Sequence, residues 1–448
     1  MGGRTRAAAL GAGVTVADPV TLAQSIADSL VASAVSDGDR ATWLAPVVAE
    51  GSHRHVTLET GDATLYQGSA GIAWACAEAA AILGRDDLAR VALEGVRGAI
   101  ASAGAEPGPS VGSELGSGLY DGLTGIGLVA LAVGSRLGDR DLAERGRDIL
   151  DRAAAGPASG PELVRGEAGV IVGLLAADRI DGGHRWLPTA KRHGEALLAA
   201  AQRRSWGWAW PLPEMDEPAL CGLAHGAAGI AWALGELEAA AADGTRPVDP
   251  SLAEGLAGAL RFERSWFDHR RNTWPDLRAG QVEEGAPVPH PTLWCHGAAG
   301  IGLTRLRLDR LRPDPALLAE AASALQSSVA AAVGNEAGPP TAPPFGLTLC
   351  HGLGGTLELL LTAGEALGEE AHLATARWLL DRAVVELGTD VERWPSGVAG
   401  CEWAPSLMTG LAGTMLVLLR LAEPGRLAGI GLPFVDWTER SQPATVTA

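Results

Sequence analysis

The sequence has 448 residues, of which 47% are hydrophobic and only 4% are aromatic, and its formal net charge is −18. An acidic chain of this kind lacks the basic face that phosphate binding needs, so we expect no nucleic-acid partner. Runs of β-branched and aromatic residues are scarce whereas Ala and Leu abound, which disfavours an extensive sheet and favours helix.

The sequence also bears on where the protein works. It contains no run of 18 uninterrupted apolar residues, so we expect no membrane span. The first residues lack the Leu-rich apolar stretch of a signal peptide. The five cysteines are irregularly spaced and do not resemble a disulfide framework. We therefore expect a soluble protein of the reducing cytoplasm.

A Gly-x-x-Gly motif followed by an apolar stretch recurs seven times, from YQGSAGIAWACAEAAAILG near the start to MTGLAGTMLVLLRLA near the end. Each repeat is long enough for two helices and their loops. The first glycines of the seven motifs are Gly68, Gly122, Gly166, Gly226, Gly297, Gly352 and Gly410.

Two kinds of helix are predicted within the repeats. The segments that follow the glycines are apolar nearly all round, which is typical of helices buried on several faces. The segments 87–102, 140–155, 317–333 and 372–387 are amphipathic, with apolar residues spaced three and four apart. We predict an all-α fold, an α/α toroid of seven inner and seven outer helices.

The residue before each first glycine is mostly polar, although a position that only turned the chain would not need to be. We expect these side chains to line one end of the barrel, where the N-termini of the inner helices favour anions. In chain order they are Gln67, Asp121, Arg165, His225, His296, His351 and Thr409.

Two Cys-His-Gly triplets occupy equivalent positions in the fifth and sixth repeats. Cys295 precedes His296, and Cys350 precedes His351, while His225 fills the matching position one repeat earlier. Two thiolates and one imidazole would bind zinc and leave its fourth position open, as in catalytic zinc sites. The wide separation of the two cysteines differs from the close pairs of structural zinc sites.

The blocks GLAHGAAGI, WCHGAAGI and LCHGLGG resemble the signature of the lanthionine synthetase C-like family, the LanC-type cyclases. The resemblance covers roughly residues 20–435 and is greatest to the cyclase domain of class II (LanM-type) lanthipeptide synthetases. It implies a helical toroid over 20–435, flanked by a disordered segment at 1–19 and a tail at 436–448. It also implies one Zn²⁺ per chain, with Cys295, Cys350 and His351 as ligands and His225 as the acid/base residue.

The implied reaction adds a Cys thiolate of a ribosomally made precursor peptide to a dehydroalanine or dehydrobutyrine of the same peptide. This Michael-type addition closes a lanthionine or methyllanthionine ring. The enolate that it leaves must be protonated, and a histidine cycles protons at neutral pH. We further interpret His296 as a residue that orients the site or stabilises the enolate, and Asp121 as one that fixes an imidazole tautomer. The stretch VPHPTLWC lacks the Arg that stand-alone family members carry before the first zinc ligand.

Two other functions are compatible with the same sequence. A LanC-like protein could add glutathione or another thiol to dehydrated residues, and a toroid that has lost its activity could serve as a peptide-binding scaffold. A prenyltransferase-like barrel is disfavoured, because it would need an aromatic funnel and an Asp-Cys-His metal set. A chain of 448 residues leaves no room for the dehydratase of a class II synthetase, so we expect a separate dehydratase as a partner.

Two Trp- and Pro-rich linkers, 203–220 and 270–291, interrupt the helices before the fourth and fifth repeats. Trp206, Trp208 and Trp210 alternate as in a short strand. These linkers are expected either to pack over the barrel wall or to form a rim that grips peptide through aromatic anchors.

Overall fold

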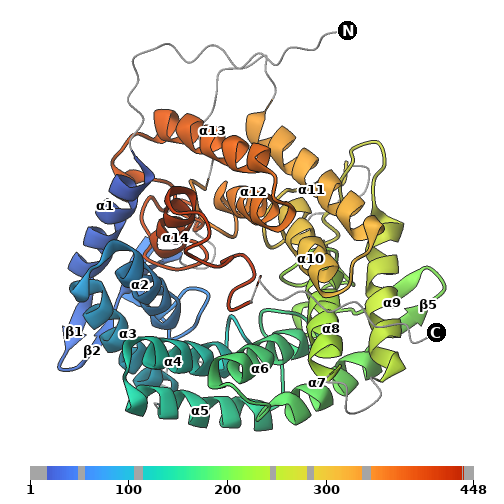
Figure 1. The fold of residues 1–448 in the computed structure, drawn as a ribbon, viewed down its shortest axis with the longest axis horizontal. Helices are drawn as coiled ribbons and strands as arrows, with labels where there is room; N and C mark the ends of the chain where they lie inside the picture. The colour runs from blue at the N-terminus through green and yellow to red at the C-terminus, as the bar shows by residue number, and fades with distance from the viewer. Residues whose placement is uncertain are drawn as a thin grey trace.

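A computed structural model describes residues 18–48, 56–104, 115–242, 249–279, 287–334, 345–435 and 437. In this part of the chain, two concentric layers of α-helices form a closed ring (Figure 1). The inner layer consists of α2 (Ser69–Leu83), α4 (Leu123–Leu137), α6 (Glu167–Asp181), α8 (Ala227–Ala241), α10 (Ala298–Leu311), α12 (Gly354–Leu367) and α14 (Leu411–Ala422). The outer layer consists of α1 (Pro19–Ala32), α3 (Asp86–Gly104), α5 (Arg140–Ala155), α7 (Leu187–Ala199), α9 (Pro250–Trp266), α11 (Pro315–Val333) and α13 (Glu370–Leu387). The predicted toroid of seven inner and seven outer helices is confirmed.

The ring closes because the first helix packs against the last. The amphipathic segments predicted from the sequence lie in α3, α5, α11 and α13, each of which follows its inner partner. The seventh outer helix, α1, instead precedes the first repeat and packs on α14. Helices from the two ends of the chain thus form one inner–outer pair, and the C-terminal repeat is covered from outside.

The second glycine of each motif lets the turns pack closely around the ring. A Cβ on Gly300 would lie 2.0 Å from the carbonyl oxygen of Trp294 and 2.7 Å from Cβ of Leu223 in the preceding repeat. The other six glycines meet the carbonyl six residues upstream at 1.9 to 2.8 Å. Since real Cβ atoms do not approach so closely, these positions accept only glycine. The seven are Gly71, Gly125, Gly169, Gly229, Gly300, Gly355 and Gly413.

A belt of backbone hydrogen bonds joins the turns that precede the inner helices. Most of the backbone N–H and C=O groups in this belt belong to residues that stand two positions before a motif's first glycine. The bonds run from Tyr66 N to Tyr120 O, Tyr120 N to Val164 O, Leu163 N to Ala224 O, Ala224 N to Cys295 O, Cys350 N to Met408 O and Met408 N to Tyr66 O, with lengths from 2.9 to 3.1 Å. Among the described residues, none joins the Cys295 turn to the Cys350 turn.

The described strands form three antiparallel hairpins outside the ring helices. They pair β1 (Val35–Asp37) with β2 (Arg40–Thr42), β3 (Leu44–Val48) with β4 (Val56–Thr60), and β5 (Gln202–Arg204) with β6 (Gly207–Ala209). Trp208 in β6 and Trp210 just after it are buried, and the Trp210 indole donates to Leu197 O at 2.8 Å. These two tryptophans therefore pack over the barrel wall, whereas Trp206 is 47% exposed.

The segment after α14 turns into the centre of the ring (Figure 1). Backbone N–H groups of Ile430 and Gly431 donate to Glu358 Oε1 at 2.7 and 3.0 Å, and the Gly431 carbonyl accepts from the Trp294 indole at 2.7 Å. Glu358 and its ion-pair partner Arg420 are fully buried. The final described residues thus tie α12, α14 and the fifth repeat together from inside.

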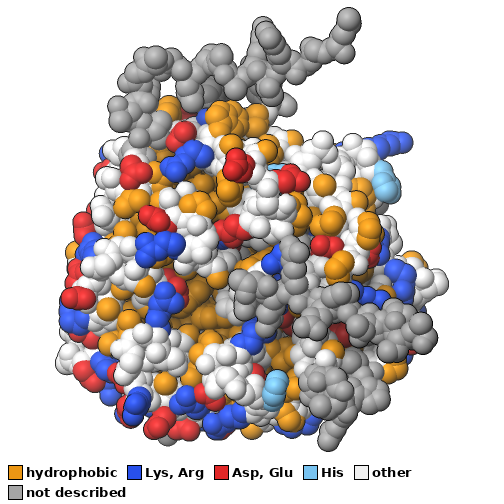
Figure 2. All heavy atoms as spheres, in the orientation of Figure 1, with side chains coloured by type: hydrophobic (Ala, Val, Ile, Leu, Met, Phe, Trp, Pro, Cys, Tyr) orange, Lys and Arg blue, Asp and Glu red, His pale blue; other side chains and the backbone are white. Residues whose placement is uncertain are grey.

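The surface in Figure 2 has charged side chains of both signs around its perimeter and hydrophobic side chains in a central hollow. By length and composition one described helix, α11, could cross a membrane, with a mean hydropathy of 1.4 over its most apolar window. In the structure α11 packs on α10 as an outer helix of the ring, and its Glu320 pairs with the buried Arg305 at 2.6 Å.

The predicted termini lie almost wholly outside the described residues. Of the segment 1–19, only Asp18 and Pro19 are described, and Pro19 already begins α1. Of the tail 436–448, only Trp437 is described. The domain limits of 20 and 435 stay predictions.

Candidate metal centre

The turns of the fifth and sixth repeats differ from the others. Gly297 has φ +112°, a backbone conformation that favours glycine, and a Cβ there would lie 1.8 Å from the Pro291 carbonyl oxygen. The first glycines of the other six motifs have no such positive φ. In the sixth repeat the helix starts at Gly354, two residues after the first glycine. These two irregular turns carry Cys295, Cys350 and His351.

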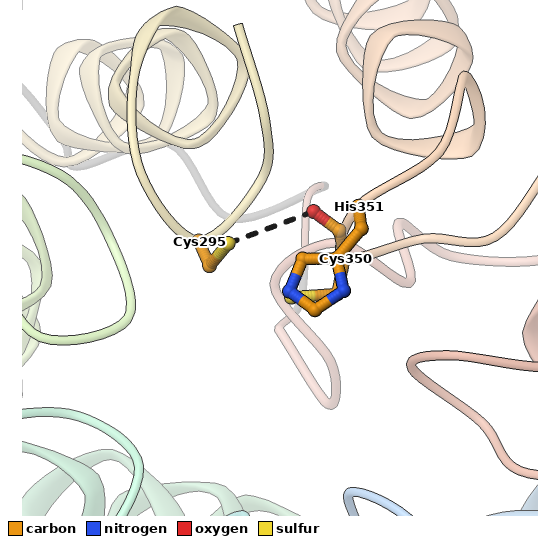
Figure 3. Close-up of side chains that lie close together, drawn as sticks. All are labelled: Cys295, Cys350 and His351. Atoms are coloured by element: carbon orange, nitrogen blue, oxygen red, sulfur yellow. Dashed lines mark hydrogen bonds between the residues drawn. The ribbon is translucent and has the colours of Figure 1, made fainter. Parts of the chain in front are cut away.

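The three predicted ligands lie together. One ligand atom from each of Cys295, Cys350 and His351 can be chosen so that all lie within 4.8 Å of one another (Figure 3). Both cysteines are buried, and Cys295 Sγ is 3.7 Å from the Cys350 carbonyl oxygen at the junction that the backbone belt does not bridge. Two soft sulfurs and one imidazole are a donor set that suits zinc, so the residues fit the implied metal.

The three groups perturb one another's protonation. Hydrogen bonding to Cys350 and His351 lowers the pKa of Cys295 well below its ordinary value. Burial raises the pKa of Cys350. For His351, burial opposes the charged form, but the hydrogen bond and the charge interaction with Cys295, together with the hydrogen bond to Gly397, raise its pKa above the ordinary value. These shifts favour a thiolate at Cys295 beside a protonated imidazole at His351. A bound metal cation could replace the protons of the His351 imidazole and the Cys350 thiol.

A pair of histidines lies beside this set. The rings of His225 and His296 stack with centroids 5.6 Å apart, and His296 directly follows the candidate ligand Cys295. His225 Nδ1 is 2.7 Å from Oε2 of Glu162, a fully buried side chain. A carboxylate accepts here, so Nδ1 carries the proton and Nε2 is the basic nitrogen of His225. Burial lowers the pKa of His296.

Asp121 does not have the predicted neighbour. Its carboxylate pairs with Arg165 at 2.8 Å, and these two residues occupy the same position in adjacent repeats. The carboxylate that contacts an imidazole at this rim is Glu162, which also accepts backbone N–H groups of Val164 and Arg165. Glu162 thus accepts hydrogen bonds both from the backbone of the third turn and from the His225 imidazole of the fourth turn.

Arg278 brings positive charge to the site from the linker 270–291. Its guanidinium pairs with the buried Asp276 at 2.6 Å, and hydrogen bonding to that carboxylate raises the pKa of Arg278. Electrostatic interactions link Arg278 to Cys295 and Asp276 to His296. An arginine thus lies near the candidate ligand Cys295, although it comes from 17 positions upstream, outside the stretch VPHPTLWC.

An aromatic cluster adjoins the ligands. Tyr66 donates its hydroxyl to Cys350 Sγ at 2.9 Å and packs edge-on against Tyr120, with ring centroids 6.3 Å apart. Tyr120 in turn packs edge-on against Trp294, the residue before Cys295, with ring centroids 5.3 Å apart. These residues were not singled out from the sequence. One feature could have pointed to them: the chain's two tyrosines and two of its cysteines stand two positions before a motif's first glycine.

The other three cysteines lie apart from the set. Cys76 is fully buried in α2, and burial raises its pKa to about 12, so it packs there as a small hydrophobic residue. Cys221 is buried just before α8, while Cys401 is half-buried in a loop. All five cysteines are free thiols in the structure.

The fold and site together define a helical toroid with a thiolate-rich candidate metal centre at one rim. The family model of the lanthionine synthetase C-like proteins matches residues 59–436. The chain belongs to this family. Its greater likeness to class II cyclase domains stays a prediction.

One solved structure supports the helical toroid, and two others are similar to a smaller degree. A structure of nisin cyclase is 17% identical, with a TM-score of 0.56 over 80% of this chain and 88% of that one. A sugar epimerase from a ruminal bacterium is 13% identical, with a TM-score of 0.49 over 91% of this chain and 99% of that one. An α-1,6-mannanase from Salegentibacter sp. HEL1_6 is 11% identical, with a TM-score of 0.44 over 90% and 99%.

Proposed function

We propose that this protein is a zinc-dependent lanthipeptide cyclase. The observation that carries the proposal is the convergence of Cys295, Cys350 and His351 from two distant turns, with the His225–Glu162 pair nearby. Family membership supports a cyclase-like role, and the donor set supports zinc. The reaction adds a peptide S–H across the double bond of a dehydroalanine or dehydrobutyrine, so one C–S bond and one C–H bond form and nothing is oxidised.

Cys295, Cys350 and His351 would hold one zinc ion per chain. Bound zinc would supply a positive centre that keeps the incoming peptide sulfur as a thiolate at neutral pH. The free thiol has an ordinary pKa of about 8.5 and is mostly protonated under those conditions.

The chain's own residues would then move the protons. His225, with Nδ1 held by Glu162, presents Nε2 as a base for the thiol proton and, once protonated, as an acid for the α-carbon of the enolate. His296 stacks on His225 and would keep that ring in place. Arg278 contributes positive charge where the enolate oxygen develops negative charge. Asp121 would act through its pair with Arg165 at the rim, rather than on an imidazole.

The partners follow from the chemistry of the substrate. A dehydrated, Cys-containing precursor peptide is the substrate, and an earlier dehydration must supply its double bond, which we assign to a separate dehydratase. Both site sulfurs must stay reduced to bind metal. The reducing cytoplasm is therefore the proposed location.

The test uses the purified protein, its metal content verified, and a dehydrated precursor peptide with free cysteines. Cyclisation protects the peptide thiols from alkylation while the peptide mass stays constant, and mass spectrometry before and after alkylation measures both. His225→Asn should slow thiol loss by about 100-fold, because general acid–base groups contribute at least this much.

Two results would contradict the proposal. If the peptide gained the mass of glutathione when that thiol was present, and formed no ring, the protein would be an intermolecular thiol transferase. If thiols disappeared no faster than in buffer while the peptide bound the protein, the toroid would be a scaffold.

A further inference from the structure

The two tyrosines of this chain form an unequal pair beside the candidate metal ligands. Tyr66 and Tyr120 both stand two positions before a motif's first glycine, in adjacent repeats. Their rings meet edge to face, and Tyr66 N donates to Tyr120 O at 2.9 Å. The backbone belt also holds Tyr66 from the other side, since Met408 N donates to Tyr66 O at 3.1 Å. The ring of Tyr66 is thus fixed by its neighbours.

The two hydroxyl groups have different surroundings. The Tyr66 hydroxyl lies 2.9 Å from Cys350 Sγ, well within the range of a hydrogen bond to sulfur. The hydroxyl of Tyr120, a fully buried residue, has no hydrogen-bond partner among the described residues. A neutral phenol donates and a thiolate accepts, so Tyr66 is oriented to donate to Cys350.

The chemistry of the proposed site gives this donor a purpose. A site that activates a peptide sulfur toward a carbon–carbon double bond must not let its own sulfurs attack the same bond. A hydrogen bond draws electron density from a thiolate and lowers its nucleophilicity. Cys295 has the charge of Arg278 in its vicinity, and Cys350 has the phenol of Tyr66. Each ligand sulfur thus has a nearby positive charge or hydrogen-bond donor that makes it less nucleophilic than the incoming peptide sulfur.

We propose that Tyr66 is a positioning residue that donates a hydrogen bond to the Cys350 ligand and keeps that sulfur a bound spectator in the presence of a dehydrated peptide. Tyr120 supports the Tyr66 ring by packing and makes no such bond. This inference rests on the proposed metal site. Groups that hydrogen-bond to the ligands of a metal orient those ligands and tune the metal, and their removal typically costs 10- to 100-fold in metal affinity.

The test compares Tyr66→Phe with Tyr120→Phe in the full chain loaded with Co²⁺, whose sulfur-to-metal charge-transfer absorption reports electron donation by the thiolates. Tyr66→Phe should move that band to lower energy and weaken Co²⁺ binding by about 10-fold. It should also make Cys350 the site of covalent addition when the loaded protein meets a dehydrated peptide, detected by peptide mapping. Tyr120→Phe should leave the band, the affinity and Cys350 unchanged.

Unchanged absorption and affinity in Tyr66→Phe, or equal shifts in both variants, would overturn the inference while leaving the metal site intact. Wild-type protein that binds no Co²⁺ would overturn the proposed function as well. If Tyr66→Phe lost its helical circular dichroism, fluorotyrosine would be incorporated into Tyr120→Phe, where Tyr66 is the sole tyrosine. A more acidic phenol donates more strongly, so the band should then move to higher energy, and an unmoved band would overturn the inference.

Discussion

At the scale of single residues, Glu162 is the hydrogen-bond partner of His225, the candidate acid/base group. Its carboxylate is fully buried, accepts from His225 Nδ1 at 2.7 Å, and also accepts from two backbone N–H groups of its own turn. The structure contains a second Glu–His pair of the same type, Glu167 with His193, between α6 and α7. The two pairs allow a matched comparison.

Glu162→Gln should lower the cyclisation rate by about 100-fold, because an amide N–H facing Nδ1 favours the tautomer with the proton on Nε2 and so removes the base. Zinc content should stay at the wild-type value, since Glu162 is not a ligand. The rate of thiol loss from a dehydrated peptide is the measurement. Glu167→Gln is the control and should cyclise at the wild-type rate; equal rates in both variants would show that the tautomer of His225 does not matter.

The pairing of Cys295 with Cys350 could be predicted from the sequence because the repeat places them in equivalent turns, whereas the choice of His351 as the third candidate ligand came from the family resemblance. The neighbours of these ligands could not be predicted. Glu162 is a buried acid whose imidazole partner, His225, lies in the next repeat. Asp276 and Arg278 pair with each other within a linker that has no periodicity. The structure pairs the Asp121 carboxylate with Arg165, which occupies the same position in the next repeat, and the role of Asp121 toward an imidazole stays a prediction.

At the scale of elements, the Gly-x-x-Gly turn sets the spacing between repeats. The second glycine lies under a carbonyl of its own turn and against the side chain of the preceding repeat, and the contact recurs until Leu407 meets Gly71 and completes the circle. The sequence could show the motif and its number of copies. It could not show that α1 serves as the seventh outer helix, because α1 carries no motif and its partner is almost 400 residues away.

Gly300→Ala should destabilise the protein by about 3 kcal/mol, because its Cβ would overlap the Trp294 carbonyl and Leu223 and force the turn to shift. Trp294 precedes the ligand Cys295, so metal content should fall too. Thermal denaturation followed by circular dichroism measures the loss. Gly183→Ala, where a Cβ meets nothing within 4 Å, should stay within about 0.5 kcal/mol of wild type; a similar loss in both variants would contradict the close-packing account.

At the scale of the whole molecule, the ring is held by backbone bonds at every junction of the described turns except that between Cys295 and Cys350. The candidate ligands lie on the two sides of that junction, and the C-terminal segment supports it from within through the hydrogen bond between Gly431 and Trp294. A metal ion at this place would join the fifth and sixth repeats where the backbone does not. Toroid closure and the chemistry of the site would then depend on the same three side chains.

The zinc content of the purified protein, measured by mass spectrometry of the metal, tests this most directly when wild type is compared with Cys350→Ala and Cys76→Ala. Cys76 is buried outside the ligand set, so its variant controls for the loss of a thiol from the core. We predict about one zinc per chain in wild type and Cys76→Ala, and little in Cys350→Ala. Folded wild-type protein that contains no zinc and takes none up, or Cys350→Ala that keeps its full zinc content, would contradict the account.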